Sequence, residues 1–240
     1  MKNNLVNTEV LILCGGRGKR LGSITKKIPK PLVRIGKKSI IEQKIKYYSA
    51  QGFKNYIFCI GYKGKVIRKF LEKKYKSPNF SDGGINSGIL KRIYLAKKYT
   101  HKPFIVSYGD TLAKINFKDL LKKHINSKAV LTIVVAPIKN PFGIVDSDSK
   151  GQLIQFKEKP MLNHFIGYAV FDPKIFKYLS KKVINMKDGL GMVKAIQQLI
   201  SKKLVYVYKF NGLQLTVNSK NELKNANIKF KKYFTFNETF

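Results

Sequence analysis

Short apolar runs alternate with amphipathic stretches along most of this chain. Apolar, β-branched-rich runs predict strands at Glu9–Leu13, Asn55–Ile60, Pro103–Ser107, Val130–Ala136 and Leu204–Phe210. The stretches between them have helical spacing, as in Lys63–Lys74, where apolar side chains recur on one face. Further helices are predicted at Ser39–Gln51, Ser87–Lys98, Phe117–His124, Pro173–Leu179, Gly191–Ser201 and from Ser219 to about Phe230.

Strands separated by helices favour parallel pairing with helices on both faces of the sheet. We therefore expect a Rossmann-like, doubly wound α/β fold with a mostly parallel, mixed sheet. Three shorter segments, Gly143–Val145, Gln152–Phe156 and Ile166–Phe171, predict mixed strands appended to that sheet. No Pro/Gly/Ser-rich linker or repeat divides the chain, so we expect a single domain over residues 1–230 and a C-terminal tail over 231–240.

The charge of the chain is unusual and points to anionic partners. The 240 residues include 48 Lys and Arg against 13 Asp and Glu, a net charge of +35. Such a field attracts nucleic acid, acidic membranes and phosphorylated small molecules alike. Only five of the basic residues are Arg, and no nucleic-acid motif or interleaving of aromatic with basic residues is visible, so we do not expect a specific nucleic-acid partner. We expect most lysines to form a solvated surface.

Several other classes of protein are excluded by the sequence. No apolar run approaches the roughly 18–20 residues of a membrane span, so we expect no membrane insertion. Cys14 and Cys59 lie in apolar runs and are predicted to be reduced core thiols. The three histidines lack metal-motif spacing, and no Ser-His-Asp arrangement is visible. We expect a cytoplasmic protein.

The most informative local motif is a glycine loop after the first predicted strand. Gly15, Gly16 and Gly18 follow Leu13 closely, at the strand end where parallel sheets bind ligands. Glycines allow backbone N–H groups to approach phosphate oxygens. Arg20 offers a guanidinium fork, and Lys30 stands between two prolines in a stiff segment.

Two common phosphate motifs do not fit this loop. The dinucleotide fingerprint requires a glycine where Leu21 stands. The P-loop requires Ser or Thr where Arg20 stands. The loop therefore serves another kind of phosphate site, or is an ordinary strand-to-loop turn.

Six motifs in order resemble the sugar-1-phosphate nucleotidyltransferases, and most closely their glucose-1-phosphate cytidylyltransferase branch. The resemblance covers roughly residues 9–225. The matching segments are Gly15–Leu21, Pro29–Leu32, Cys59–Gly64, Ser107–Asp110, Phe156–Pro160 and Val170–Pro173.

The resemblance implies that the phosphate of a sugar 1-phosphate attacks the α-phosphorus of a nucleoside triphosphate, giving a nucleotide-sugar and pyrophosphate. The substrate brings its own nucleophile, which agrees with the absence of a hydrolase triad. Fixed cations and Mg²⁺ would offset the repulsion between the two phosphates. CTP is favoured as the nucleotide, and a homo-oligomer is left open.

The resemblance also implies roles for single residues. Arg20, Lys30 and Lys159 would be catalytic, with Lys159 on the sugar phosphate. Nucleotide binding would fall to Leu13, Gly15, Gly16, Gly18, Ser87 and Gly88. Gly143 and Glu158 would contact sugar hydroxyls. Arg92 is a further candidate for phosphate binding.

Asp110 is also indicated by its place in the sequence. It follows an apolar strand in a chain with few acids, and such a carboxylate suits Mg²⁺, which takes one or two carboxylates plus phosphate oxygens. The alternative is a cap or turn residue for the following segment.

Three departures from the family pattern leave alternatives open. The usual second metal-binding Asp is Asn218 in one alignment and Thr216 in another, so we expect Asp110 and Asn218 as a weakened metal pair. Ile89 stands where Arg is common beside the base, and Phe165-Ile166-Gly167 replaces a usual Asn-containing triplet. The alternatives are a guanylyl- or thymidylyltransferase, a weakened homologue that binds nucleotide or sugar phosphate, and a polyanion-binding module.

Overall fold

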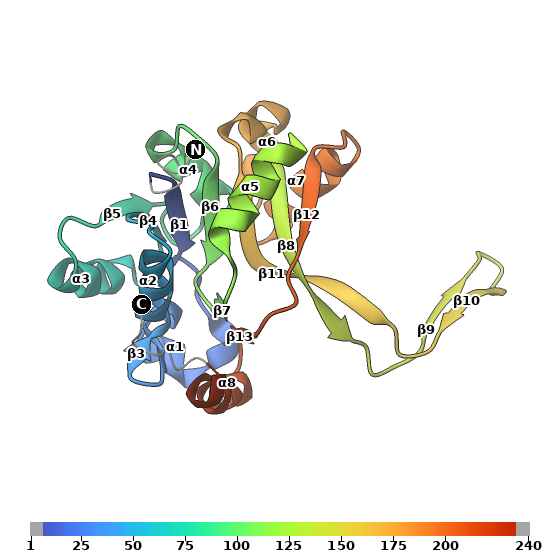
Figure 1. Ribbon diagram of the computed structural model, residues 1–240, viewed down its shortest axis with the longest axis horizontal. Coiled ribbons are helices and arrows are strands. Elements are labelled where there is room, and N and C mark those ends of the chain that lie inside the picture. The colour runs from blue at the N-terminus through green and yellow to red at the C-terminus, as the bar shows by residue number, and fades with distance from the viewer. Residues whose placement is uncertain (1–6, 234–240) are drawn as a thin grey trace.

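A seven-stranded mixed sheet forms the centre of the computed structural model, which describes residues 7–233 (Figure 1). Its strand order is β12-β8-β11-β6-β1-β4-β5. β11 is antiparallel to β6 and β8, and the other neighbouring pairs are parallel. The strands are β1 (Glu9–Leu13), β4 (Asn55–Ile60), β5 (Asn79–Asp82), β6 (Phe104–Tyr108), β8 (Leu131–Lys139), β11 (Met161–Phe171) and β12 (Val205–Lys209). The mostly parallel α/β prediction is confirmed.

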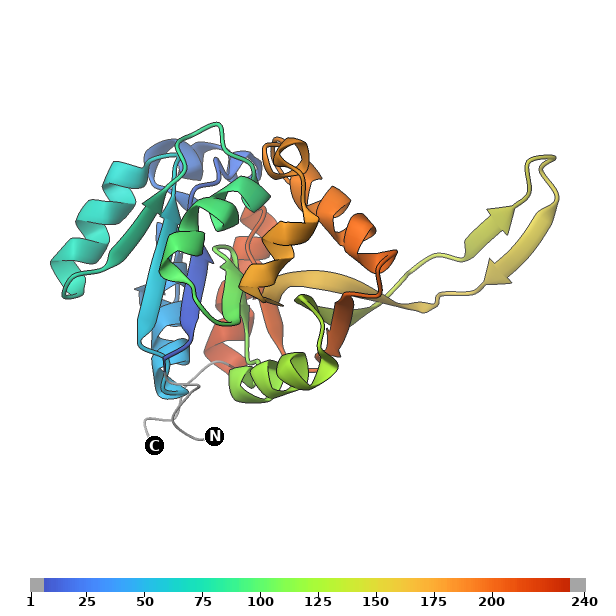
Figure 2. The ribbon, with the colours of Figure 1, turned by 90° about the horizontal axis from the view of Figure 1, so that it is seen from above.

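Helices cover both faces of this sheet, because side chains along each strand alternate between two apolar cores (Figure 2). Val10 and Ile12 belong to one core, and Leu11 between them belongs to the other. The first core is covered by α2 (Ile40–Ala50), α3 (Gly64–Lys74) and α5 (Phe117–Ser127). The second is covered by α4 (Ile89–Ala96), α6 (Lys181–Ile184) and α7 (Leu190–Ile200).

A third, smaller apolar core joins residues 21–40 to Leu112 and to residues 213–230. Leu21, Leu112, Leu215 and Ala226 meet in it. Its elements are α1 (Ser23–Lys27), β2 (Arg34–Ile35), β3 (Lys38–Ser39), β7 (Thr111–Ala113), β13 (Gln214–Thr216) and α8 (Lys220–Tyr233). β7 and β13 pair antiparallel, which carries the C-terminal segment to the sheet edge where β6 ends.

A β-hairpin projects beyond the sheet. β9 (Ile144–Ser147) and β10 (Leu153–Lys157) pair antiparallel as a separate ribbon. We call residues 140–160 the arm, and it extends away from the body in both views (Figures 1 and 2). Its exposed apolar side chains are Phe142, Val145, Leu153, Ile154 and Phe156. A lone two-stranded hairpin is marginally stable in water, and these apolar side chains lie largely uncovered.

Local differences from the predicted elements have simple causes. β5 and the short ribbons β2–β3 and β7–β13 were not predicted, because each is short and β5 is mostly polar. β11 begins at Met161 rather than Ile166, since its first half pairs with β8 beside the arm. The segment after Asp172 is a 3₁₀ turn, Pro173–Tyr178, instead of an α-helix. Further 3₁₀ turns lie at Lys19–Leu21, Lys30–Leu32 and Lys97–Tyr99.

The last helix, α8 (Lys220–Tyr233), runs to the end of the described residues. α8 continues past Phe230 to Tyr233, and the remainder of the predicted 231–240 tail lies outside the described residues. Across residues 7–233, every helix is too short or too polar to cross a lipid bilayer.

Candidate active site

The loops that follow β1, β4 and β5 lie side by side at one sheet edge. Backbone hydrogen bonds join them: Cys14 N donates to Cys59 O at 2.8 Å, Tyr62 N to Gly15 O at 3.1 Å, and Gly83 N to Ile60 O at 3.2 Å. This is the carboxyl edge of parallel strands, where α/β sheets bind ligands.

The glycine loop presents an open backbone at this edge. Gly16 is exposed, and a Cβ added there would meet nothing within 4 Å. Gly18 has a φ of +62°, which favours glycine. The Thr25 hydroxyl donates to the Gly18 carbonyl at 3.0 Å and fixes the loop from the α1 side. Phosphate oxygens can therefore reach the loop without meeting side chains at Gly16.

Arg92 supports the loop from beneath. Its guanidinium donates to the Ile60 carbonyl at 2.7 Å, and the residue is buried. A Cβ at Gly15 would lie 2.2 Å from Arg92 Nη1, and one at Gly61 would lie 2.1 Å from it. The sequence proposed Arg92 as a phosphate-binding candidate. The structure corrects this, because burial under the loop leaves Arg92 a packing and hydrogen-bonding role.

Lys30, Asp110, Asn218 and Arg20 meet in one hydrogen-bonded group, which we call the cluster. Lys30 Nζ donates to Asp110 Oδ2 at 2.7 Å and to Asn218 Oδ1 at 2.8 Å. Arg20 Nη2 donates to the same Asn218 oxygen at 2.9 Å. The side chains of Lys30 and Asp110 are 11% and 24% exposed, so the pair is shielded yet reachable from solvent.

Three close backbone approaches bring the cluster together. The Lys30 stem packs against Gly18, where a Cβ would lie 3.2 Å from Lys30 Cβ. Gly109 presses on the end of β1, and a Cβ there would lie 2.4 Å from the Leu13 carbonyl oxygen. Val217 N donates to the Asp110 carbonyl at 3.0 Å. The glycine loop, the β6–β7 turn and the C-terminal segment therefore share one small region.

The structure distinguishes the two positions that sequence alignment left open for the second metal ligand. Thr216 lies in β13, paired with Thr111 of β7. Asn218 lies beyond that strand with its side-chain oxygen on Lys30 and Arg20. The cluster therefore contains Asn218.

Glu222 is a neighbour of the cluster that the sequence analysis missed. Its Oε2 accepts a hydrogen bond from Asn218 N at 2.6 Å. The signal was present, because Ser219 and Glu222 have the spacing of a capping box at the start of α8. Glu222 N donates to Ser219 Oγ at 3.2 Å, as that motif requires.

The oxygens of the cluster suit a divalent cation. Asp110 Oδ2 and Asn218 Oδ1 already converge on one positive centre, the Lys30 ammonium. One carboxylate and one amide oxygen, completed by water and phosphate, match what Mg²⁺ accepts in proteins. No group of three His, Cys, Asp or Glu side chains able to hold a metal occurs within residues 7–233, so the other ligands would come from substrate and water.

Ser87 and Gly88 lie on the neighbouring loop of the same edge. The Ser87 hydroxyl donates to the Gly83 carbonyl. A Cβ at Gly88 would lie 2.2 Å from the Met186 carbonyl oxygen, and Ile89 N donates to Asp188 O at 2.8 Å. This loop is therefore held between β5 and the segment that precedes α7.

Gly143, Glu158 and Lys159 all belong to the arm, whose strands β9 and β10 project from the body (Figure 1). A Cβ at Gly143 would lie 3.3 Å from Glu158 Oε2. Lys159 Nζ lies 3.2 Å from Glu158 Oε1, and the two side chains are 56% and 59% exposed. Within the described part of the chain, no hydrogen bond or ion pair joins these three residues to the cluster.

Comparisons with known proteins identify relatives among the nucleotidyltransferases. The family model described as nucleotidyl transferase matches residues 9–214. A Bacillus subtilis protein described as "Probable glucose-1-phosphate cytidylyltransferase" is 29% identical over 247 residues, covering 91% of this chain and 94% of its own. The D-glycero-α-D-manno-heptose 1-phosphate guanylyltransferase of Aneurinibacillus thermoaerophilus is 32% identical over 159 residues, covering 63% and 67%.

A solved structure shares the fold. HddC from Yersinia pseudotuberculosis, complexed with GMP-PN, superposes with a TM-score of 0.71 at 22% identity. The match covers 93% of this chain and 99% of that one.

Proposed function

Because this chain belongs to the nucleotidyl transferase family, we propose that it joins a nucleoside triphosphate to a sugar 1-phosphate and releases pyrophosphate. The observation that carries this proposal is the cluster of Lys30, Arg20, Asp110 and Asn218 beside an open glycine loop. A reaction between two phosphates requires fixed cations and a cation-binding carboxylate at one place. The nucleotide-sugar formed would serve the synthesis of surface polysaccharide or another glycan.

The side chains of the cluster align and neutralise the substrates. The sugar phosphate is the nucleophile, so catalysis consists of positioning and charge stabilisation. Lys30 and Arg20 would hold the phosphates of the nucleotide and stabilise the departing pyrophosphate. When bound, Mg²⁺ supplies further neutralisation of phosphate oxygens, and Asp110 and Asn218 are the residues that would hold it.

The loops of the sheet edge form the proposed nucleotide site. Backbone N–H groups around Gly15, Gly16 and Gly18 would face the phosphates, with the end of β1 at Leu13 beside them. Ser87 and Gly88 would lie along the base. CTP is the favoured nucleotide, supported by the cytidylyltransferase relative. The guanylyltransferase relative supports GTP as the alternative.

The arm carries the proposed sugar-phosphate contacts. Lys159 would bind the sugar phosphate, and Glu158 and the Gly143 backbone would contact sugar hydroxyls. These groups stand away from the cluster in the structure, so sugar binding requires the arm to approach a cluster. The arm reaches the cluster of its own chain by bending at its base, or the cluster of a second copy when two chains associate.

We further propose that the arm docks on a second copy of this chain. Residues 140–160 contain three Asp or Glu and three Lys, so the arm is electrically neutral on a chain of net charge +35. The positively charged bodies of two copies repel each other, but a neutral, apolar arm can approach the body of a second copy without that repulsion. Its exposed apolar side chains then gain the cover that an isolated hairpin lacks.

Light scattering coupled to size-exclusion chromatography tests this docking. Wild type is expected to run as a dimer or larger assembly, and Phe156→Ser as a smaller species. Ile125→Ser on α5 is the matched control, because Ile125 is 57% and Phe156 59% exposed. A monomeric wild type, or an unchanged mass for Phe156→Ser, would contradict docking through the arm.

We place the protein in the cytoplasm. Cys14 and Cys59 are both buried and unpaired, which agrees with a reducing compartment.

A grid of pyrophosphate-release assays tests the proposed reaction. Four nucleoside triphosphates and several sugar 1-phosphates are combined with Mg²⁺, and the highest kcat/KM is expected with CTP. Highest turnover with GTP or dTTP would replace the cytidylyl assignment by its alternative. No turnover anywhere, with nucleotide binding intact, would instead favour the weakened homologue that the Asn218 amide suggests.

A further inference from the structure

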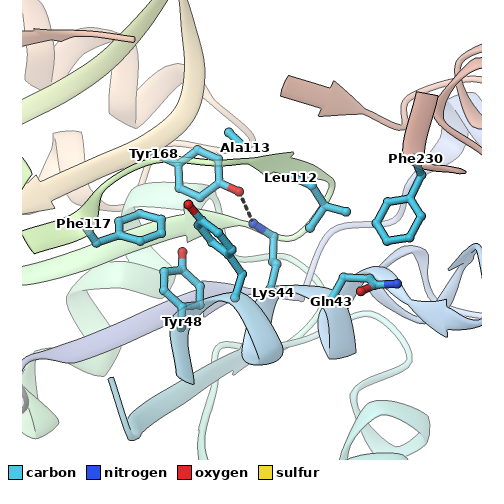
Figure 3. Close-up of a pocket in the computed structure, with 9 residues that line it drawn as sticks. Gln43, Lys44, Tyr48, Leu112, Ala113, Phe117, Tyr168 and Phe230 are labelled. Atoms are coloured by element: carbon cyan, nitrogen blue, oxygen red, sulfur yellow. Dashed lines mark hydrogen bonds between the residues drawn. The ribbon is translucent and has the colours of Figure 1, made fainter. Parts of the chain in front are cut away.

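A fully buried lysine lies directly behind the turn that carries Asp110. Lys44 of α2 is 2% exposed, and its Nζ donates to Ser107 Oγ at 2.6 Å. It also donates to the Tyr168 hydroxyl at 2.8 Å (Figure 3). The nitrogen also lies 4.4 Å from the centroid of the Tyr168 ring. Burying an ammonium among side chains such as Leu112 and Phe117 is costly, so its presence calls for a compensating interaction.

The two hydrogen bonds of Lys44 reach both ends of the Asp110 turn. Ser107 is in β6, three residues before Asp110. The Tyr168 hydroxyl, which accepts from Lys44, donates to the carbonyl of Thr111 in β7 at 2.6 Å. The turn is thus held directly on its β6 side and through Tyr168 on its β7 side.

Electrostatics point to the same connection. Burial lowers the pKa of Lys44 to about 7, and the charges of Asp110 and Cys14 act in the opposite direction. The other titratable groups that line its pocket are the phenols of Tyr47, Tyr48 and Tyr168, whose pKa values burial raises. Asp110 is therefore the carboxylate that favours a positive charge at Lys44, from an otherwise apolar pocket.

We propose that Lys44 is a positioning residue that holds the β6–β7 turn, and with it the Asp110 carboxylate, in the geometry needed to bind a divalent cation. The connection runs from Lys44 to Ser107 on one side and through Tyr168 to Thr111 on the other. This inference rests on the proposed function in one respect, the assignment of Asp110 as a cation ligand.

Replacing the amine without shortening the side chain tests this role. Lys44→Met is expected to weaken Mn²⁺ binding about tenfold, measured by EPR titration of the free protein with the metal alone. The kcat is expected to fall about tenfold, with the KM of both substrates unchanged, because the substrate-binding loops are not touched. Mn²⁺ titration needs no turnover, so it gives an answer even if the proposed reaction fails.

Tyr168→Phe provides a second variant in case Lys44→Met does not fold. It removes the hydroxyl that links Lys44 to Thr111, and the same direction of change is expected. Tyr47→Phe is the matched control, because Tyr47 lines the same pocket and its hydroxyl donates to the Ile115 carbonyl, away from the Asp110 turn. A purely structural Lys44 would lower the melting temperature and leave Mn²⁺ affinity unchanged.

Two results would overturn the inference. One is wild-type Mn²⁺ affinity in both Lys44→Met and Tyr168→Phe. The other is the absence of Mn²⁺ binding in wild type, because Asp110 would then bind no cation and Lys44 could not position it for one.

Discussion

The cluster and the arm hold charged pairs of opposite character. Lys30 and Asp110 are 80 residues apart in the chain, come from different elements and meet at 2.7 Å in a shielded place. Glu158 and Lys159 are neighbours in sequence, meet at 3.2 Å and are more than half exposed. Exposed ion pairs contribute little to stability and rearrange easily, whereas a shielded pair fixed by the fold keeps its geometry. The body therefore presents a cluster of fixed geometry, and the arm presents charged groups that solvent leaves free to rearrange.

The largest expected effect comes from removing the carboxylate of the cluster. Asp110→Asn is expected to lower kcat at least about 100-fold, because the one carboxylate that would bind the cation is lost while the shape is kept. Steady-state kinetics and a thermal melt measure this. An unchanged kcat in a folded variant would show that the cluster is not the cation site.

A smaller effect is expected on the arm. Lys159→Met is expected to raise the KM for the sugar 1-phosphate about tenfold, the value of one charge-assisted contact, and to leave the KM for the nucleotide unchanged. Lys150→Met, at the tip of the same arm, is the control. Equal changes in the KM for the sugar 1-phosphate and the KM for the nucleotide would contradict the assignment of sugar binding to the arm and nucleotide binding to the body.

A gain is expected when the missing charge is restored to the cluster. Asn218→Asp places a second carboxylate beside Lys30, and the Mg²⁺ concentration for half-maximal rate is expected to fall several-fold. Titrating turnover with Mg²⁺ measures this. A requirement for more Mg²⁺ would show that Lys30 and Arg20 neutralise the new carboxylate before the cation does.

The last prediction concerns stability alone and contrasts a buried lysine with an exposed one. The pKa of Lys44 is lowered from 10.5 to about 7 by burial, so between these values the unfolded chain binds more protons than the folded one. The free energy of unfolding of wild type should therefore rise with pH from about 7 to 10.5 relative to Lys44→Met. Urea unfolding at several pH values measures the difference. Lys159→Met should follow wild type throughout, and a parallel curve for Lys44→Met would contradict the shift.

The sequence predicted the sheet and helices well because the central strands are continuous apolar runs and the helices between them are amphipathic. Runs such as Glu9–Leu13 and Asn55–Ile60 are apolar on both faces, which is typical of central parallel strands. β5 and the β7–β13 ribbon carried no such signal, since their pairing depends on neighbours distant in the chain.

The members of the site were predictable to different degrees. The motifs indicated Lys30 and Asp110, but only the fold shows that they contact each other and Asn218. Lys44 falls among the many lysines expected at the solvated surface, because nothing in a helical pattern distinguishes a charged side chain that faces inward. Arg92 was misassigned for the related reason that its target, the Ile60 carbonyl, is a backbone atom with no sequence signature.

The packing of Arg92 beneath the glycine loop restricts which substitutions are tolerated at Gly15, Gly61 and Arg92 itself. A methyl group at Gly15 or Gly61 would collide with the guanidinium, and at Gly61 also with the Gly84 carbonyl 2.6 Å away. Shortening Arg92 first would remove a donor from the Ile60 carbonyl. At Gly61 the clash includes backbone that cannot give way, whereas at Gly15 the guanidinium could move aside only by disturbing its hydrogen bond to the Ile60 carbonyl. Descendants of this chain would therefore retain Gly15 and Gly61 for reasons internal to the protein, even if the ligand changed.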